Sequence, residues 1–133
     1  MKKGYKALVE EANAEIETIS PQEAAKRAEG GDTLLIDIRD IRELQREGRV
    51  PGAKHCPRGM LEFWIDPESP YHKDIFSSGK SFVFFCAAGW RSALATKTAQ
   101  DMGLEKVAHI DGGFGAWREA GLAVEAPPER ASD

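Results

Sequence analysis

Residues 81–102, SFVFFCAAGWRSALATKTAQDM, change from a strand pattern to a helix pattern within a few positions. Residues 81–85 form a short apolar run that follows the turn sequence SSGK, which predicts a buried strand. From Arg91 to Met102 the composition favours a helix, and Gly103 can end it. Cys86 therefore lies where a strand leads into a helix, and this edge of an open α/β sheet is where ligands bind.

The loop CAAGWRS, residues 86–92, has the composition of an anion-binding cradle. Its small residues leave backbone N–H groups open, and the start of the following helix adds positive partial charge. A thiolate is stabilised in such surroundings, and Arg91 adds a fixed positive charge. We therefore predict that Cys86 is ionised at neutral pH and nucleophilic. A buried core cysteine is the alternative, but Gly89 at the bend and Ser92 at the helix start favour the functional interpretation.

Length and composition limit the function classes. The 133 residues predict one domain with a substantial core, and 41% hydrophobic with 30% charged residues is typical of a soluble globular protein. The net charge of -4, without a basic block, argues against nucleic acid as a partner. Neither a signal peptide nor a membrane span is evident, so we expect a cytoplasmic protein with no membrane partner.

The remaining chain predicts strands that alternate with helices. Apolar strands separated by helices predict a parallel sheet covered on both faces. Ser20-Pro21-Gln22-Glu23 has the form of a capping box at a helix start. The expected strands are 16–19, 33–38, 54–57, 81–85 and 107–110, and the expected helices are 4–14, 21–28, 40–47, 60–65, 91–102 and 114–120. The expected organisation is a loosely docked leader helix in 1–15, with Tyr5, Leu8 and Val9 on its apolar side, a domain in 16–126 and a flexible tail in 127–133.

The order of motifs resembles the rhodanese-like domain over residues 16 to 124. The motifs are Asp37-Ile38-Arg39, Glu43, Val50-Pro51-Gly52-Ala53, the loop 86–92, Asp111-Gly112-Gly113-Phe114 and Trp117. The resemblance implies an α/β fold whose five-stranded, mainly parallel sheet is flanked by helices on both faces. It also implies a single-domain sulfurtransferase of the thiosulfate type.

The resemblance implies a role for each loop residue. Cys86 would take the outer sulfur of a donor such as thiosulfate, hold it as a persulfide and pass it to cyanide or a thiol. The persulfide-binding residues would be Ala87, Ala88, Gly89, Trp90, Arg91 and Ser92. Arg91 would hold the anionic end of the donor. The chemistry calls for no metal or organic cofactor, and the histidines at 55, 72 and 109 lack ligand spacing with the cysteines, so we expect surface or packing roles for them.

We expect supporting roles for four further residues, Arg58, Asp37, Arg39 and Cys56. Arg58 is either a second anion contact or an arginine paired with Glu62. Asp37 and Arg39 are expected to form a buried polar pair that supports the loop. Cys56 is expected to be a reduced core thiol, with a resolving role beside Cys86 as the weaker alternative. The aromatic side chains of residues 58–76 are expected in core or lid packing for the most part.

Two other functions use the same cysteine. Cysteine phosphatases and arsenate reductases resemble Cys-x5-Arg, often with a preceding histidine, whereas four residues separate Cys86 from Arg91 and Phe85 comes first. The shorter loop has less room for a tetrahedral phosphate, which favours sulfur. A persulfide carrier or sensor that docks to a protein partner fits the loop as well as an enzyme does. The physiological donor, the acceptor and the oligomeric state stay open.

Overall fold

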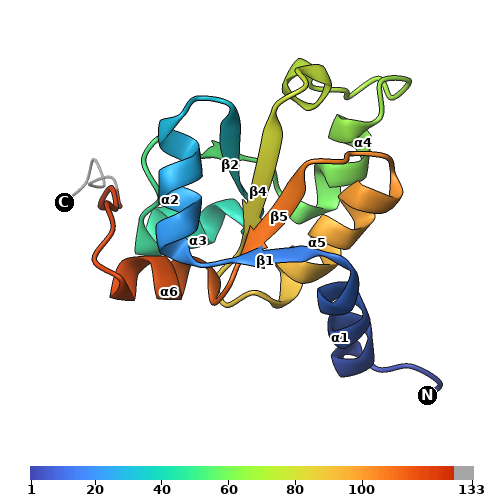
Figure 1. Cartoon of the computed structure of the whole chain (residues 1–133), viewed down its shortest axis with the longest axis horizontal. Helices are drawn as coiled ribbons and strands as arrows, with labels where there is room; N and C mark the ends of the chain where they lie inside the picture. Colours follow the sequence, from blue (N-terminus) through green and yellow to red (C-terminus); the bar gives the residue numbers. More distant parts are fainter. Residues whose placement is uncertain (128–133) are drawn as a thin grey trace.

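The computed structural model describes residues 1–127 and contains a five-stranded sheet between two layers of helices (Figure 1). All strand pairs within the sheet are parallel, which confirms the expected fold class. The spatial order is β1-β5-β4-β2-β3, so β4 is the central strand. The strands are β1 (Glu17–Ile19), β2 (Thr33–Asp37), β3 (Lys54–His55), β4 (Ser81–Phe85) and β5 (Val107–Ile110).

Helices cover both faces of the sheet. Buried residues of α4 and α5 pack on one face, and those of α2 and α6 pack on the other. Helix α1 lies against the outer side of α5 (Figure 1). The helices are α1 (Tyr5–Glu15), α2 (Pro21–Glu29), α3 (Ile41–Glu47), α4 (Leu61–Ile65), α5 (Trp90–Asp101) and α6 (Gly113–Glu119), with 3-10 turns at Arg58–Met60 and Asp74–Ser77.

Strand β4 contributes to the core on both of its faces. Phe82 and Phe84 belong to the cluster beneath α4 and α5, whereas Val83 and Phe85 belong to the cluster beneath α2 and α6. Successive side chains of a strand point to opposite faces, so a strand buried on both sides is apolar at every position. The apolar run that precedes Cys86 thus fixes the strand at the centre of the sheet.

The starts of α2 and α3 differ from the sequence prediction. Ser20 caps α2 by accepting a hydrogen bond from the Glu23 N–H at 3.1 Å. The Glu23 carboxylate binds Arg27 and does not return to Ser20, so only half of the predicted capping box forms. A complete box occurs at α3, where Asp40 caps the helix and Glu43 accepts from the Asp40 N–H. Asp40, predicted as the first helical residue, therefore precedes the helix as its cap.

The apolar side predicted for α1 is only partly buried. Ala12, on the same side of the helix, is buried and Val9 is half-buried, whereas Tyr5 and Leu8 stay largely exposed. The helix is nevertheless tied to the domain by polar contacts at its C-terminal end. Gln100 donates to the Glu15 carbonyl at 3.0 Å, and Lys97 lies 3.1 Å from the Glu15 carboxylate.

The segment 58–76 divides into packed and exposed aromatic residues. Phe76 is buried, and Trp64 packs against the same core cluster. Phe63 and Tyr71 are exposed, so two of the four side chains are in core packing and the lid role of the other two stays a prediction. Of the predicted tail 127–133, residues 128–133 lie outside the described part of the chain.

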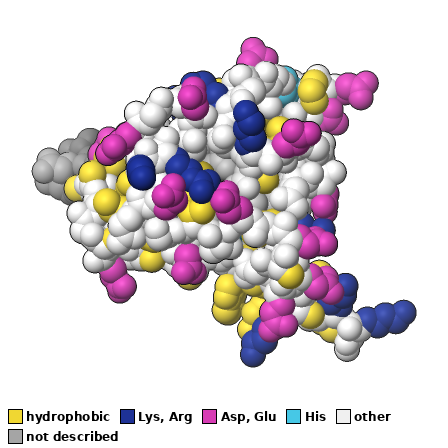
Figure 2. Space-filling model, in the orientation of Figure 1, with side chains coloured by type: hydrophobic (Ala, Val, Ile, Leu, Met, Phe, Trp, Pro, Cys, Tyr) yellow, Lys and Arg dark blue, Asp and Glu magenta, His cyan; other side chains and the backbone are white. Residues whose placement is uncertain are grey.

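The surface carries mixed charge. On the face shown in Figure 2, acidic and basic side chains are interspersed, and a single basic block is not seen there. Within residues 1–127, no helix has the length and apolar character needed to cross a membrane.

Candidate active site

Cys86 follows the last residue of β4 and is only 1% exposed. Two backbone groups donate to its Sγ atom, the Gly89 N–H at 3.2 Å and the Ser92 N–H at 3.4 Å. The Ser92 hydroxyl lies 3.5 Å from the same sulfur. These donors form the cradle that the sequence predicts, although only two of the loop N–H groups contact the sulfur directly.

The loop turns into α5 at Gly89. This residue has φ of +113°, a left-handed conformation that glycine adopts without strain. The helix begins at Trp90, one residue before the predicted start, so its first turn lies beside the sulfur and adds positive partial charge there. The Trp90 side chain is 60% exposed, and its ring packs on Tyr5 of α1 with centroids 5.0 Å apart.

The first residues of α6 form backbone hydrogen bonds with the Cys86 loop. The Phe114 N–H donates to the Cys86 carbonyl at 2.8 Å, and the Gly115 N–H donates to the Ala87 carbonyl at 3.1 Å. At Gly113, where φ is +60°, a Cβ atom would overlap the Cys86 carbonyl oxygen and lie 2.9 Å from the Ala87 carbonyl carbon. Only glycine allows this close approach, so the Asp-Gly-Gly motif positions the loop backbone.

Arg91 is paired with Glu43 of α3. Its Nη1 and Nη2 atoms lie 2.6 Å and 3.0 Å from the two carboxylate oxygens. The Arg91 hydrogen bonds hold the pKa of Glu43 below its usual range, and Glu43 raises the pKa of Arg91, with a smaller contribution from the Cys86 sulfur. The guanidinium is therefore not a free charge, and its contact with the anionic end of a donor stays a prediction. The sequence identifies Glu43 as a motif residue but gives no sign of this contact.

Asp37 and Arg39 form the buried pair that the sequence predicts. Arg39 is fully buried, and its Nη2 atom lies 2.8 Å from the Asp37 carboxylate and 2.9 Å from the Gly48 carbonyl. The guanidinium also lies over the ring of Phe114, 4.1 Å from its centroid. Because the Phe114 N–H binds the Cys86 carbonyl, the pair contacts the residue that holds the loop. Its supporting role stays a prediction.

Arg58 and Cys56 both have contacts or surroundings typical of structural residues. Arg58 lies 2.9 Å from the Glu62 carboxylate, so it forms the ion pair that the sequence leaves open. Its role as a second anion contact stays a prediction. Cys56 is fully buried, and burial raises the pKa of its thiol to about 12. Both cysteines are free thiols in the structure. Cys56 therefore has the character of a core thiol.

His109 lies closer to the loop than the sequence suggests. It is buried, which fits a packing role, but its Nδ1 atom lies 2.9 Å from the Ser92 hydroxyl. The signal that could have revealed it is a histidine inside the apolar strand VAHI, residues 107–110. Among the described residues, no group of three or more histidine, cysteine, aspartate or glutamate side chains could hold a metal ion.

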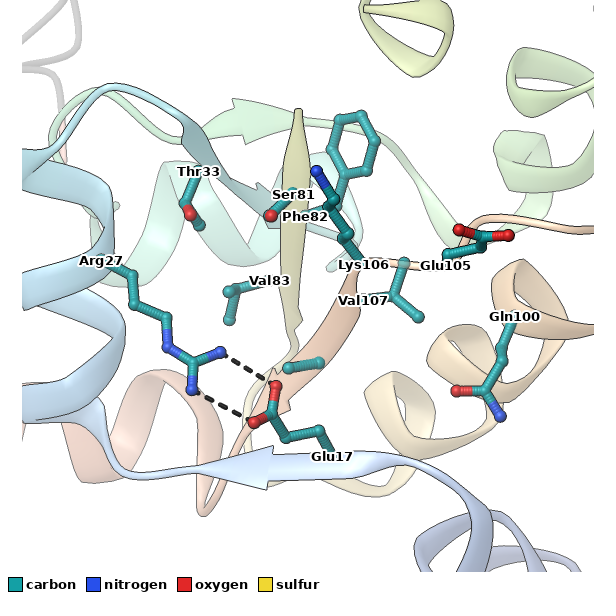
Figure 3. A pocket seen from close by; sticks show the side chains of 11 residues that line it. Glu17, Arg27, Thr33, Ser81, Phe82, Val83, Gln100, Glu105, Lys106 and Val107 are labelled. Carbon is teal, nitrogen blue, oxygen red and sulfur yellow. Dashed lines mark hydrogen bonds and ion pairs between the residues drawn. The ribbon is translucent and has the colours of Figure 1, made fainter. Parts of the chain in front are cut away.

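Cavities lie at both edges of the sheet. One of about 260 Å³ lies beside the Cys86 loop, between it, α1 and the end of β5. Another of about 390 Å³ lies at the opposite edge, where the strands begin, and Arg27 reaches across it to Glu17 (Figure 3). The thiol and its N–H donors are at the carboxyl edge only, so we take that edge as the candidate active site.

Comparison with known proteins identifies the family of this chain. A profile described as a rhodanese-like domain matches residues 20–120. A sulfurtransferase of Allochromatium vinosum is 31% identical over 100 residues, which cover 75% of this chain and 85% of that protein. Mouse thiosulfate sulfurtransferase/rhodanese-like domain-containing protein 3 is 31% identical over 91 residues, which are 65% of this chain but only 58% of the mouse protein.

Two solved structures share the fold over most of this chain. A Rhodopseudomonas palustris protein of unknown function, described as a possible tyrosine phosphatase, is 57% identical with a TM-score of 0.90, covering 94% of this chain and 96% of that one. The polysulfide-sulfur transferase homodimer of Wolinella succinogenes is 35% identical with a TM-score of 0.70, covering 91% of this chain and 86% of that one. On the profile match and the site geometry together, this chain belongs to the rhodanese-like domain family.

Proposed function

We propose that this protein is a sulfurtransferase that carries sulfane sulfur on Cys86. The observation that carries the proposal is the pair of backbone N–H groups, from Gly89 and Ser92, directed at the Cys86 sulfur. Such donors stabilise negative charge on a thiolate and on a persulfide, and they need no reorganisation during the reaction. The family membership and the sulfurtransferases among the relatives support the same chemistry.

The proposed reaction has two balanced steps. In the first, the Cys86 thiolate attacks the outer sulfur of thiosulfate, a new S–S bond forms, and sulfite leaves with the electron pair of the broken S–S bond. In the second, cyanide or a thiolate attacks the outer sulfur of the Cys86 persulfide. The product is thiocyanate or a new persulfide, and the Cys86 thiolate is regenerated. No oxidant or reductant is consumed in either step.

Intact mass after incubation with thiosulfate tests the proposal. We expect one added sulfur atom in the wild-type protein and in Cys56→Ala, and none in Cys86→Ser. Cys56→Ala is the matched control because its thiol is buried and its pKa is raised. If neither thiosulfate nor polysulfide adds sulfur to the wild-type protein, the proposal is wrong. Sulfur loading with negligible thiosulfate:cyanide turnover would identify a persulfide carrier that serves a protein partner.

A phosphatase is the second candidate, because the 57% identical relative is described as a possible tyrosine phosphatase. One feature opposes it in this chain. Only four residues separate Cys86 from Arg91, so the loop has less room for a tetrahedral phosphate than a five-residue loop would have. Aryl phosphate hydrolysis that is lost in Cys86→Ser would reverse this ranking.

A further inference from the structure

His109 is placed beside the candidate active site by the register of the sheet. It lies in β5 opposite Phe84 of β4, two residues before Cys86. The strand is buried at all four positions, so a polar ring there needs hydrogen-bond partners. The ring has partners on both nitrogen atoms, and one of these partners contacts the Cys86 sulfur.

A continuous line of polar atoms joins Cys86 to His109. The Cys86 Sγ atom lies 3.5 Å from the Ser92 Oγ atom, and that Oγ atom lies 2.9 Å from His109 Nδ1. All three residues are buried, so solvent does not compete for these contacts. The line runs from the loop through the first turn of α5 to β5.

The far side of the ring determines which nitrogen holds the proton. His109 Nε2 lies 3.1 Å from Asn13 Oδ1 and 3.1 Å from the Thr18 hydroxyl oxygen. The Asn13 oxygen can only accept, so Nε2 carries the hydrogen and Nδ1 is left as an acceptor. Ser92 then donates to Nδ1, and its oxygen is free to accept the hydrogen of the Cys86 thiol.

We infer that His109 is a positioning residue that takes the Cys86 thiol proton through the Ser92 hydroxyl. The thiol proton moves to Ser92 Oγ while the proton of that hydroxyl moves to His109 Nδ1. The products are a thiolate and an imidazolium, so atoms and charge balance and no other reactant is needed. In the thiolate state Ser92 donates to the sulfur, and the imidazolium donates to Ser92. This role goes beyond the proposed function and rests on it for its use, because sulfur transfer starts from the thiolate.

The surroundings of the ring allow the proton to leave on the side away from the sulfur. The cavity of about 260 Å³ is lined by Asn13, Thr18, His109 and Asp111, among others, so it adjoins the Nε2 side. Burial lowers the pKa of His109, while the exposed Asp111 carboxylate acts in the opposite direction. The neutral ring is thus the resting form, and the imidazolium releases its proton readily.

The charged groups near the relay lie on three elements. Asp111 follows β5, and Arg91, which precedes Ser92 in the first turn of α5, is paired with Glu43 of α3. The contacts from α1 and β1 are the neutral side chains of Asn13 and Thr18. Substitution of His109 could also shift the pH profile by disturbing the Arg91–Glu43 pair. A double variant of His109 and Ser92 distinguishes the two causes, because an effect that passes through Ser92 disappears once Ser92 is replaced.

The test is the pH profile of Cys86 alkylation by iodoacetamide, read by peptide mass so that Cys56 is scored separately. His109→Asn retains an acceptor for Ser92 but cannot take a proton. We expect its profile to move to higher pH, and a midpoint higher by about one pH unit makes alkylation about tenfold slower at any pH below both midpoints. Ser92→Ala should behave in the same way, and the double variant should be no slower than Ser92→Ala alone. The ring of His72 binds Ser77, away from the Cys86 loop, so His72→Gln is the matched control and should keep the wild-type profile.

Two outcomes would overturn the inference. One is a wild-type profile in a folded His109→Asn protein, and the other is a double variant whose effects simply multiply. Because a buried substitution can prevent folding, imidazole ¹⁵N shifts of the wild-type protein provide a second measurement. They should show the Nε2–H tautomer of His109, and an Nδ1–H tautomer would contradict the relay. Alkylation uses no sulfur donor, so failure of sulfur loading with a His109-dependent profile would reject the proposed function and leave the relay intact.

Discussion

At the carboxyl edge of the sheet Arg91 binds Glu43 through two nitrogen–oxygen contacts, and at the amino edge Arg27 binds Glu17 in the same way. The amino edge also has the larger cavity of the two compared (Figure 3). What differs is the backbone. At the carboxyl edge a strand ends in a loop whose N–H groups point at a thiol, whereas the amino edge contributes strand beginnings and no cysteine to its cavity lining. Neither an ion pair nor a cavity therefore identifies the chemistry, and the loop after β4 does.

The largest expected difference between the two edges is in the stability that their ion pairs contribute, and the buried Asp37–Arg39 pair lies at the carboxyl edge. Asp37→Asn removes the closer of the two carboxylates that face the fully buried Arg39, and only Glu47, 3.7 Å away and partly exposed, remains. Breaking a buried ion pair costs about 3–5 kcal/mol, and because Glu47 remains we expect a loss near the lower end of that range in the free energy of unfolding by urea. Glu17→Gln at the amino edge is the control, and its exposed pair should contribute no more than about 1 kcal/mol. Equal losses in both variants would contradict the distinction between the edges.

Two glycines, one at each edge of the sheet, test how far the backbone contacts of the Cys86 loop contribute to stability and to sulfur loading. Gly113 and Gly79 both have positive φ, but an added Cβ meets the loop carbonyls at Gly113 and open space at Gly79, before β4. Left-handed backbone costs about 1–2 kcal/mol for a residue with a Cβ, so Gly79→Ala should lose that amount. Gly113→Ala should lose about 1–3 kcal/mol more through overlap and displace the loop, so that sulfur loading also falls.

Thermal unfolding and intact mass after thiosulfate measure the two effects. If Gly113→Ala matches Gly79→Ala in stability and still loads sulfur, the contact between α6 and the loop does not position Cys86.

The third prediction concerns the two arginines. Arg91→Ala should raise the KM for thiosulfate by about ten- to hundredfold, because a hydrogen bond to a charged group contributes about 1.5–3 kcal/mol. Arg27→Ala is the matched control at the amino edge and should leave the KM unchanged. Thiosulfate:cyanide kinetics measure both. An unchanged KM in Arg91→Ala would remove Arg91 from the donor site and leave it as a structural partner of Glu43.

The sequence is sufficient for the strands, the loop and the fold, for physical reasons that particular residues illustrate. The run SFVFF is apolar at every position after Ser81 because β4 is buried on both faces, and such a run is visible without coordinates. The turn after it is visible through Cys86, Gly89 and the helix-forming residues beyond. The sequence pattern of neighbouring residues is enough to predict an element whose formation depends on those residues alone.

The missed contacts depend on residues far apart in the chain. Glu43 and Arg91 are separated by 48 positions, and no local pattern reports that α3 and the loop meet. His109 and Ser92 meet only because β5 pairs with β4 in one register. A strand buried on both faces gives no alternation of polarity, so the direction in which His109 points cannot be read from its neighbours.

The smallest expected effect separates the two pairs by their response to acid. The pKa values of Glu43 and Glu17 are both lowered from their ordinary value, chiefly by hydrogen bonds from Arg91 and Arg27 respectively. A carboxylate whose pKa is lowered in the folded state adds stability above its unfolded pKa, and this stability disappears as the pH falls through the folded pKa. The Glu43→Gln protein should therefore be less stable than wild type at neutral pH, and the difference should shrink below about pH 4.

Burial predicts which of the two carboxylates responds more. The Glu43 side chain is 17% exposed and that of Glu17 is 53% exposed. Solvent screens exposed pairs, so Glu17→Gln should show the same pH trend with an amplitude of only about 0.2–1 kcal/mol. Urea unfolding at a series of pH values measures both. If the two variants follow one curve, the carboxyl-edge pair is no better shielded from solvent than the amino-edge pair, and only the position of Arg91 at the end of the Cys86 loop distinguishes the two arginines.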